Sequence, residues 1–144
     1  MSENKNGVEM EMTCNNDETA SNTDQVSPNG FLSYALSQEI VRALELLGYH
    51  EPTEIQREVI PAVLEGKNVV ARSRTGTGKT AAFALPILQR LCAQPLGLGK
   101  RPIRALVLTP TRELAIQIRD ELRDLCAFRD GVRVVCLYGG QAID

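Results

Sequence analysis

The chain has 144 residues and a net charge of −2, and its 43% hydrophobic and 24% charged residues are typical of a globular protein of at most one domain. No apolar run reaches membrane-spanning length, and residues 1–30 lack the basic start and apolar core of a secretory signal, so we expect an intracellular protein, cytoplasmic or nuclear, with no membrane partner. One histidine and four cysteines without paired spacing argue against a zinc site and predict free thiols.

The charge is divided unevenly along the chain. Residues 1–29 hold six acids and one base, a net charge of −5, whereas residues 30–144 carry +3. The first stretch is rich in Asn, Ser and Thr and has almost nothing to bury, so it cannot offset the entropy lost on ordering. We predict a disordered acidic tail over 1–29 and a folded body over 30–144, whose slight basic excess is compatible with nucleic acid.

The first part of the body predicts two helices. Apolar residues at helical spacing indicate a helix over 37–47, and Gly48 stands where a C-terminal cap would. A second helix begins at Thr53, because the side chain three residues later can complete a capping box. Pro61 is expected to end or kink this helix, and Gly66 to mark the turn after it.

From residue 68 onward, short apolar runs alternate with helical patterns. Such alternation is typical of an α/β fold with a parallel sheet. We expect strands over 68–71, 105–108 and 132–137, helices over about 78–92 and 111–127, and a surface loop over 94–101.

A glycine-rich stretch lies directly between the first expected strand and the helix that follows. Glycines let consecutive backbone N–H groups turn toward a phosphate, and the helix adds the positive end of its dipole. Lys79 would neutralise the β- and γ-phosphates, and the Thr80 hydroxyl would ligate Mg²⁺. The alternative is a glycine-rich turn with a solvated lysine. The loop comprises Ser73, Arg74, Thr75, Gly76, Thr77, Gly78, Lys79 and Thr80, and Ser73 stands where the strict motif has glycine or, in some families, alanine.

Two further patterns flank the loop. Residues 48–56 read Gly-Tyr-His-Glu-Pro-Thr-Glu-Ile-Gln, and residues 110–115 read Pro-Thr-Arg-Glu-Leu-Ala. Together with the phosphate loop and the later doublet of Gly139 and Gly140, they resemble the Q motif, motif Ia and glycine doublet of DEAD-box ATP-dependent RNA helicases. The resemblance covers nearly all of residues 31–144. It implies a RecA-like P-loop NTPase fold, with helices on both faces of a parallel sheet, that takes ATP and Mg²⁺ as ligands.

The adenine base would be recognised near the Q motif. A side-chain amide offers a donor and an acceptor together, which matches the N6 amine and N7 of adenine, so we expect Gln56 to contact the base. The resemblance implies that Tyr49 supports the base by stacking, that Phe31 is the isolated upstream aromatic, and that Thr53 belongs to the same site. A capping box without nucleotide contact, and ordinary core packing of the two aromatic rings, are the alternatives.

RNA would be bound near motif Ia. Arg112 begins a predicted helix at the carboxyl end of a predicted parallel strand, the edge at which open α/β sheets bind ligands. For Arg112 the alternative is an ion pair within the helix, and Glu113 is a competing partner of the helix dipole. By resemblance, a sequence-independent grip on the RNA backbone comes from Pro110, Thr111, Arg112, Gly139 and Gly140.

Hydrolysis of ATP needs groups that this sequence does not contain. The resemblance places them in an Asp-Glu-Ala-Asp stretch, a Ser-Ala-Thr stretch and arginines of a second RecA-like domain. The sequence ends at Asp144, so we expect an incomplete domain that neither hydrolyses ATP nor unwinds RNA by itself. Val69 and Val70 would then lie on unpaired edges, which predicts a loosely packed or aggregation-prone chain.

Three interpretations follow. The chain is the amino-terminal part of an ATP-dependent RNA helicase, or a short non-hydrolysing isoform that binds RNA or helicase partners, or another P-loop enzyme such as a small nucleotide kinase. The flanking motifs, and the lack of an arginine-rich lid-like insert, argue against the third.

Overall fold

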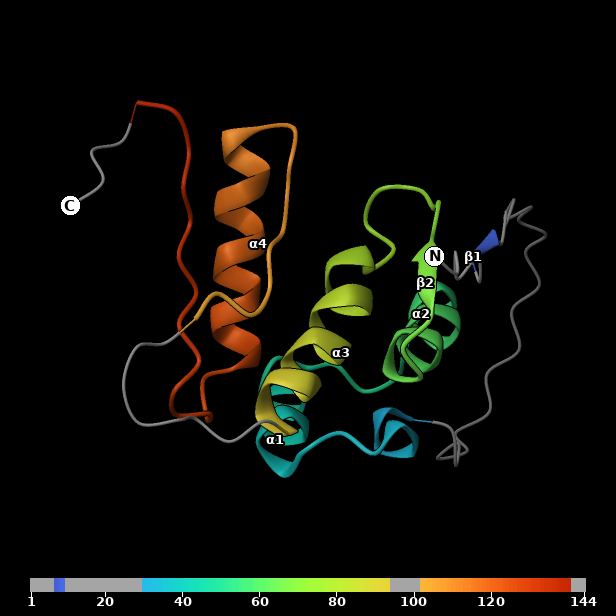
Figure 1. The fold of residues 1–144 in the computed structure, drawn as a ribbon. Helices are drawn as coiled ribbons and strands as arrows, with labels where there is room; N and C mark the ends of the chain where they lie inside the picture. The colour runs from blue at the N-terminus through green and yellow to red at the C-terminus, as the bar shows by residue number, and fades with distance from the viewer. Residues whose placement is uncertain (1–6, 10–29, 94–101, 141–144) are drawn as a thin grey trace, which may run out of the picture.

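The computed structural model describes residues 7–9, 30–93 and 102–140 (Figure 1). The predicted loop over 94–101 and most of the predicted tail over 1–29 lie outside these residues. In chain order the elements are β1 (Gly7–Glu9), the 3-10 helix η1 (Phe31–Tyr34), α1 (Gln38–Leu46), α2 (Glu54–Leu64), β2 (Asn68–Val70), α3 (Lys79–Ala93) and α4 (Arg112–Leu125).

Helix α1 ends where the sequence predicted. Gly48 adopts a left-handed φ of 75°, which a residue with a Cβ adopts only with strain. Its N–H donates to the carbonyl of Glu45 at 3.1 Å, and the N–H of Tyr49 donates to the carbonyl of Leu44 at 2.9 Å. These two bonds satisfy carbonyls at the helix end that have no partner inside the helix, so the predicted glycine cap is confirmed.

Helix α2 begins with the predicted capping box of Thr53 and Gln56, but it does not end at Pro61. Proline removes one backbone donor, yet its carbonyl still accepts, here from the N–H of Glu65 at 2.9 Å. Packing of α2 along α3 outweighs the lost bond, so the helix runs on to Leu64. It closes at Gly66, whose φ is 87°, as the sequence predicted.

Helix α3 is the centre of the packing, and it contacts α1, α2 and α4 (Figure 1). Alanines on α3 allow close approach of neighbouring helices, and larger side chains fill the space beside them. A smaller cluster of Ile55, Val59 and Ala82 lies between α2 and α3. The main core joins residues of η1, α1, α2, α3 and α4, namely Phe31, Ile40, Leu44, Ile60, Ala81, Ala84, Leu85, Leu88, Ile118, Leu122 and Leu125.

Strand β2 leads into the phosphate loop and pairs in parallel with β1. The register places Gly7 opposite Asn68 and Glu9 opposite Val70. One edge of the strand that contains Val69 is therefore paired, where unpaired edges were expected. Residues 7–9 form the partner strand within the stretch predicted to be a disordered tail, and the disorder of that tail stays a prediction. The wider prediction of a loosely packed or aggregation-prone chain stays a prediction, which the sharpness of urea unfolding would test.

The strands predicted over 105–108 and 132–137 are absent from the described structure. Both segments follow extended paths along α4 (Figure 1), and burial still alternates residue by residue over 132–137. A strand, however, is defined by backbone bonds to a neighbour, and neither segment has such a neighbour here. Apolar side chains are left exposed as a result, and the exposed fractions of Leu106 and Leu108 are 77% and 84%. The sheet of the described residues is therefore the β1–β2 pair.

Candidate functional site

The phosphate loop connects β2 to α3 and turns at two glycines. Gly76 and Gly78 have φ angles of 80° and 83°, in the region that favours glycine. At Gly78 a Cβ would also lie 2.3 Å from Nε2 of Gln56, so the position has no room for a side chain. Since the first N–H groups of any helix lack partners within it, the turn brings the open donors of α3 to the loop.

Lys79, the first residue of α3, folds its ammonium group back over the loop. Nζ donates to the carbonyl oxygen of Ser73 at 2.9 Å and to that of Arg74. The Ser73 hydroxyl is a third acceptor at 3.4 Å. The lysine charge is thus held where the loop closes, by oxygen atoms that carry only partial charge. A phosphate would be a stronger acceptor for the same ammonium group.

Two hydroxyl groups complete the loop. Oγ of Ser73 and Oγ1 of Thr77 lie 2.6 Å apart, and Thr77 Oγ1 donates to the carbonyl of Arg74 at 3.0 Å. Ser73, which departs from the strict glycine of the motif, is therefore a hydrogen-bonding member of the loop. Apart from the unusual residue itself, nothing in the sequence indicated this contact.

Helix α2 supports the loop through its capping box. The Thr53 hydroxyl donates to the carbonyl of Thr77 at 2.8 Å, and Nε2 of Gln56 donates to the carbonyl of Gly78 at 3.1 Å. The other end of the amide, Oε1, accepts from the backbone N–H of Thr53 at 2.9 Å. The sequence grouped Thr53 and Gln56 with the phosphate loop, and the structure brings all of them together.

Gln56 is 1% exposed, and each end of its amide already has a protein partner. This geometry favours the alternative of a capping and tethering role. An adenine contact would need the remaining N–H and lone pair to become accessible. Recognition of adenine by Gln56 stays a prediction.

Tyr49 and Phe31 pack with the core and have no contact with the phosphate loop among the described contacts. The two rings pack edge to face, with their centroids 6.2 Å apart. The Tyr49 hydroxyl donates a hydrogen bond to Oε1 of Glu121 in α4 at 3.4 Å. Burial, and then the Glu121 charge, raise the pKa of Tyr49 above its ordinary value. The structure thus favours the packing alternative for both rings, and the predicted support of a base by Tyr49 stays a prediction. Glu121 itself carries no motif signal, because it lies 72 residues from its partner.

The residues predicted to bind RNA come together at the beginning of α4. Thr111 caps the helix by accepting the N–H of Leu114 at 3.3 Å, directly after the exposed Pro110. Arg112 donates to the carbonyl of Gly139 at 2.7 Å, and it makes no ion pair within the helix among the described pairs. The predicted motif Ia and glycine doublet are therefore neighbours in space.

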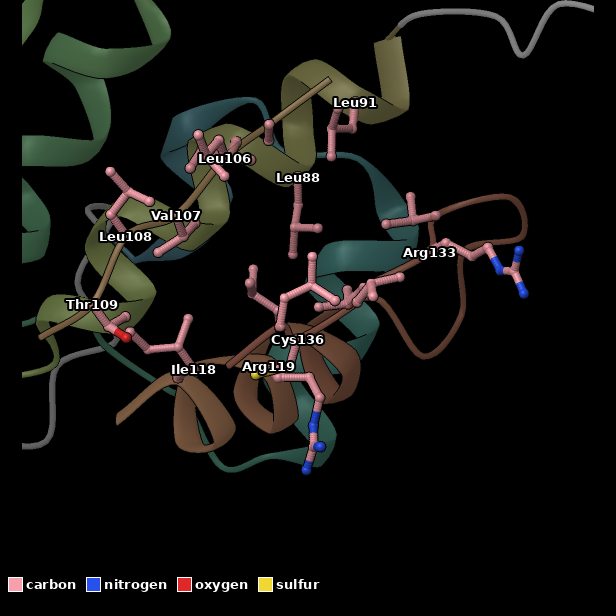
Figure 2. Close-up of a pocket in the computed structure, with 18 residues that line it drawn as sticks. Leu88, Leu91, Leu106, Val107, Leu108, Thr109, Ile118, Arg119, Arg133 and Cys136 are labelled. Carbon is pink, nitrogen blue, oxygen red and sulfur yellow. The ribbon is translucent and has the colours of Figure 1, made fainter. Parts of the chain in front are cut away.

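A cavity of about 360 Å³ lies elsewhere, between α3, α4 and the two extended segments. Figure 2 shows apolar side chains gathered in it, including Leu88, Val107 and Ile118, while the guanidinium groups of Arg119 and Arg133 point away. No residue of the phosphate loop lines it. Its apolar wall does not suit a triphosphate, so the phosphate loop remains the candidate nucleotide site.

The described residues contain no cluster of three or more His, Cys, Asp or Glu that could hold a metal ion. Ligation of Mg²⁺ by Thr80 therefore stays a prediction. No helix in the described part combines the length and apolar character needed to cross a bilayer.

The family model for DEAD/DEAH box helicases matches residues 53–144, which include the capping box of α2, the phosphate loop and α4. The chain belongs to the DEAD/DEAH box helicase family. The resemblance of its motifs to DEAD-box proteins is thereby confirmed.

Curated relatives of this DEAD-box chain are considerably longer than it is. It is 44% identical over 114 residues to the DEAD-box ATP-dependent RNA helicase CshA of Geobacillus kaustophilus (strain HTA426). The match covers 79% of this chain and 23% of CshA. The chain thus spans about a quarter of the length of that relative.

Solved DEAD-box structures share the fold. The RNA helicase Prp28 from Chaetomium thermophilum bound to ADP superimposes with a TM-score of 0.68 at 37% identity, covering 78% of this chain and 27% of Prp28. Dbp5 L327V of S. cerevisiae bound to RNA and ADP BeF3 gives a TM-score of 0.60 at 31% identity, covering 71% of this chain and 25% of Dbp5. The predicted fold class, a RecA-like α/β domain, is confirmed by these neighbours, and within the described residues its sheet is the β1–β2 pair.

Proposed function

We propose that this chain is the ATP-binding, amino-terminal portion of an ATP-dependent DEAD-box RNA helicase, with residues 30–144 as part of its first RecA-like domain. The observation that carries the proposal is the Lys79 ammonium, held over a glycine turn at the start of α3. Family membership and the nucleotide-bound neighbour support it.

ATP fits the residues of the loop. Gly76 has no atom within 4 Å of where a Cβ would lie, so the turn is open on that side, and residues 77–80 are partly accessible. Lys79 would exchange its carbonyl acceptors for phosphate oxygens, and the open N–H groups of α3 would bind the others. Thr80 would ligate Mg²⁺, which on binding would neutralise phosphate charge.

RNA would bind through its backbone at the beginning of α4. Thr111, Arg112, Gly139 and Gly140 lie together on an exposed surface, with Pro110 beside them. The helix N-terminus and the glycine backbone suit phosphate oxygens and carry no information about base identity. The RNA-bound state of the neighbour Dbp5 supports this assignment.

Hydrolysis and unwinding belong, in this proposal, to a longer protein. The printed sequence contains no Asp-Glu-Ala-Asp stretch to hold Mg²⁺ and orient water. The 144-residue chain alone would then bind ATP and RNA without turnover. The alternative is a natural isoform of this length. Because it would lack the groups that hydrolyse ATP, it would act as a non-hydrolysing module that binds RNA or helicase partners.

The test is nucleotide binding by the purified chain, measured by calorimetry with ATP and Mg²⁺. Lys79→Ala should abolish detectable binding, because the ammonium is the main charge facing the phosphates. Lys67→Ala is the matched control, since this exposed lysine pairs with Glu65 outside the loop. Equal affinity in the Lys79→Ala variant and the wild type would refute the assignment of the site.

A further inference from the structure

Arg112 and the segment Tyr138–Gly140 make a contact that a direct role in phosphate binding does not require. Nη2 of Arg112 donates to the carbonyl of Gly139 at 2.7 Å. Its guanidinium carbon lies 4.7 Å from the centroid of the Tyr138 ring. One carbonyl and one aromatic face therefore fix the same planar group, although 26 residues separate Arg112 from Tyr138.

The contact involves a turn that only glycine adopts easily. Gly140 has a φ of 84°, and a Cβ there would lie 3.7 Å from Nη2 of Arg112. A charge-assisted hydrogen bond to Gly139 and the stacked ring together restrain this turn against the first residue of α4. The turn and the N-terminus of α4 are thereby held side by side, although they are distant in the sequence.

We propose that Arg112 is a positioning residue, which holds the Gly139–Gly140 turn against the N-terminus of α4 so that backbone groups of both bind one run of RNA phosphates. Tyr138 sets the orientation of the guanidinium group. The inference rests on the proposed RNA function. A positioning residue and a direct phosphate ligand need different side chains at position 112. The positioning role needs the planar, forked guanidinium group, whereas a direct ligand needs only a positive charge.

The two roles predict different results for conservative variants. Lysine keeps the charge but cannot both stack on the ring and donate along the plane, so Arg112→Lys should lose about tenfold in RNA affinity, close to the loss in Arg112→Ala. Tyr138→Leu should lose roughly two- to fivefold without any change of charge, and Tyr138→Phe should keep the wild-type affinity.

Salt dependence separates the roles further. A lost phosphate ligand would lower the slope of log affinity against log salt by about 0.7 for single-stranded RNA. A lost positioning residue should reduce affinity and leave the slope unchanged. The probe is a fluorescently labelled single-stranded RNA of mixed sequence, followed by anisotropy with the full chain over a series of salt concentrations.

Arg42 provides a matched control, because its guanidinium carbon lies 4.4 Å from the centroid of the Phe128 ring, away from the proposed RNA surface. Arg42→Lys should bind RNA like the wild type. In the absence of RNA, NMR spectra should show the Gly139 and Gly140 amide resonances shifted in Arg112→Lys and Tyr138→Leu but not in Arg42→Lys.

Full affinity in Arg112→Lys, with a reduced salt slope in Arg112→Ala, would identify a direct ligand and overturn the inference. Wild-type affinity in Tyr138→Leu, or unshifted glycine resonances, would also overturn it. A wild-type chain that binds no RNA while these resonances still shift would instead refute the proposed RNA function, and this inference with it.

Discussion

Nε2 of Gln56 donates a hydrogen bond to the carbonyl oxygen of Gly78, 3.1 Å away, and so ties helix α2 to the turn that precedes α3. Oε1 of the same amide caps α2 at Thr53. A residue expected to recognise adenine is therefore already part of the support of the phosphate loop. Any contact with a nucleotide base would be coupled to the geometry of the triphosphate site.

Gln56→Ala should weaken the binding of inorganic tripolyphosphate as well as that of ATP. The variant leaves the Gly78 carbonyl and the Thr53 N–H without a side-chain partner and loosens the loop. Calorimetric titration with both ligands measures the effect. If ATP binding falls while tripolyphosphate binding is unchanged, Gln56 acts on the base and not on the loop.

Gly78→Ala should cost more stability than Gly76→Ala. Both positions have left-handed φ, which costs about 1–2 kcal/mol for alanine. Only at Gly78 does a Cβ also meet the amide of Gln56, at 2.3 Å, and displacing that buried amide breaks its hydrogen bonds. We expect a loss of about 3 kcal/mol at Gly78, measured by urea unfolding. Equal losses in the two variants would contradict the role of the contact.

Ser73→Ala should tighten ATP binding by roughly threefold. The Ser73 hydroxyl bonds with Thr77 and helps to hold the Lys79 ammonium against the loop in the absence of ligand. Removing it destabilises that arrangement relative to the one in which the ammonium contacts phosphate. Ser33→Ala is the control, because it removes a hydroxyl of η1 that donates a hydrogen bond to the carbonyl of Gly30. Weaker ATP binding in Ser73→Ala would show that the hydroxyl favours the bound state instead.

Tyr49 should make stability depend on pH in the alkaline range. Its pKa is raised above the ordinary 10.0, first by burial and then by Glu121, so the folded state favours the neutral phenol. A raised folded-state pKa gives stability that is complete below pH 10.0 and is lost as the pH rises through the folded-state value. The free energy of unfolding should therefore fall less steeply above pH 10.0 in Tyr49→Phe than in the wild type.

Ultraviolet absorbance of tyrosinate provides a second measurement for Tyr49. Glu121→Gln removes the nearby negative charge, so ionisation of Tyr49 should begin at a lower pH than in the wild type. An unchanged titration would show that burial alone raises the pKa.

The local elements of this protein could be predicted from its sequence because each depends on neighbouring residues. Gly48 and Gly66 end helices through their own backbone conformation, and Thr53 begins one through a residue three positions later. The phosphate loop is local in the same sense, since Gly76, Gly78 and Lys79 define its turn and its charge. Of the two outcomes predicted for Pro61, an end of the helix does not occur, because packing along α3 sustains the helix to Leu64, whereas a kink stays a prediction.

The relationships between distant residues were decided only by the tertiary structure. Packing aligned Gln56 with Gly78, Tyr49 with Glu121, and Arg112 with Gly139, and no spacing in the sequence encodes these distances. The segments 105–108 and 132–137 also depend on the tertiary structure, because it decides whether they form strands. Their apolar composition favours strands, but a strand also requires a neighbour for its backbone, and in the described structure neither segment has one.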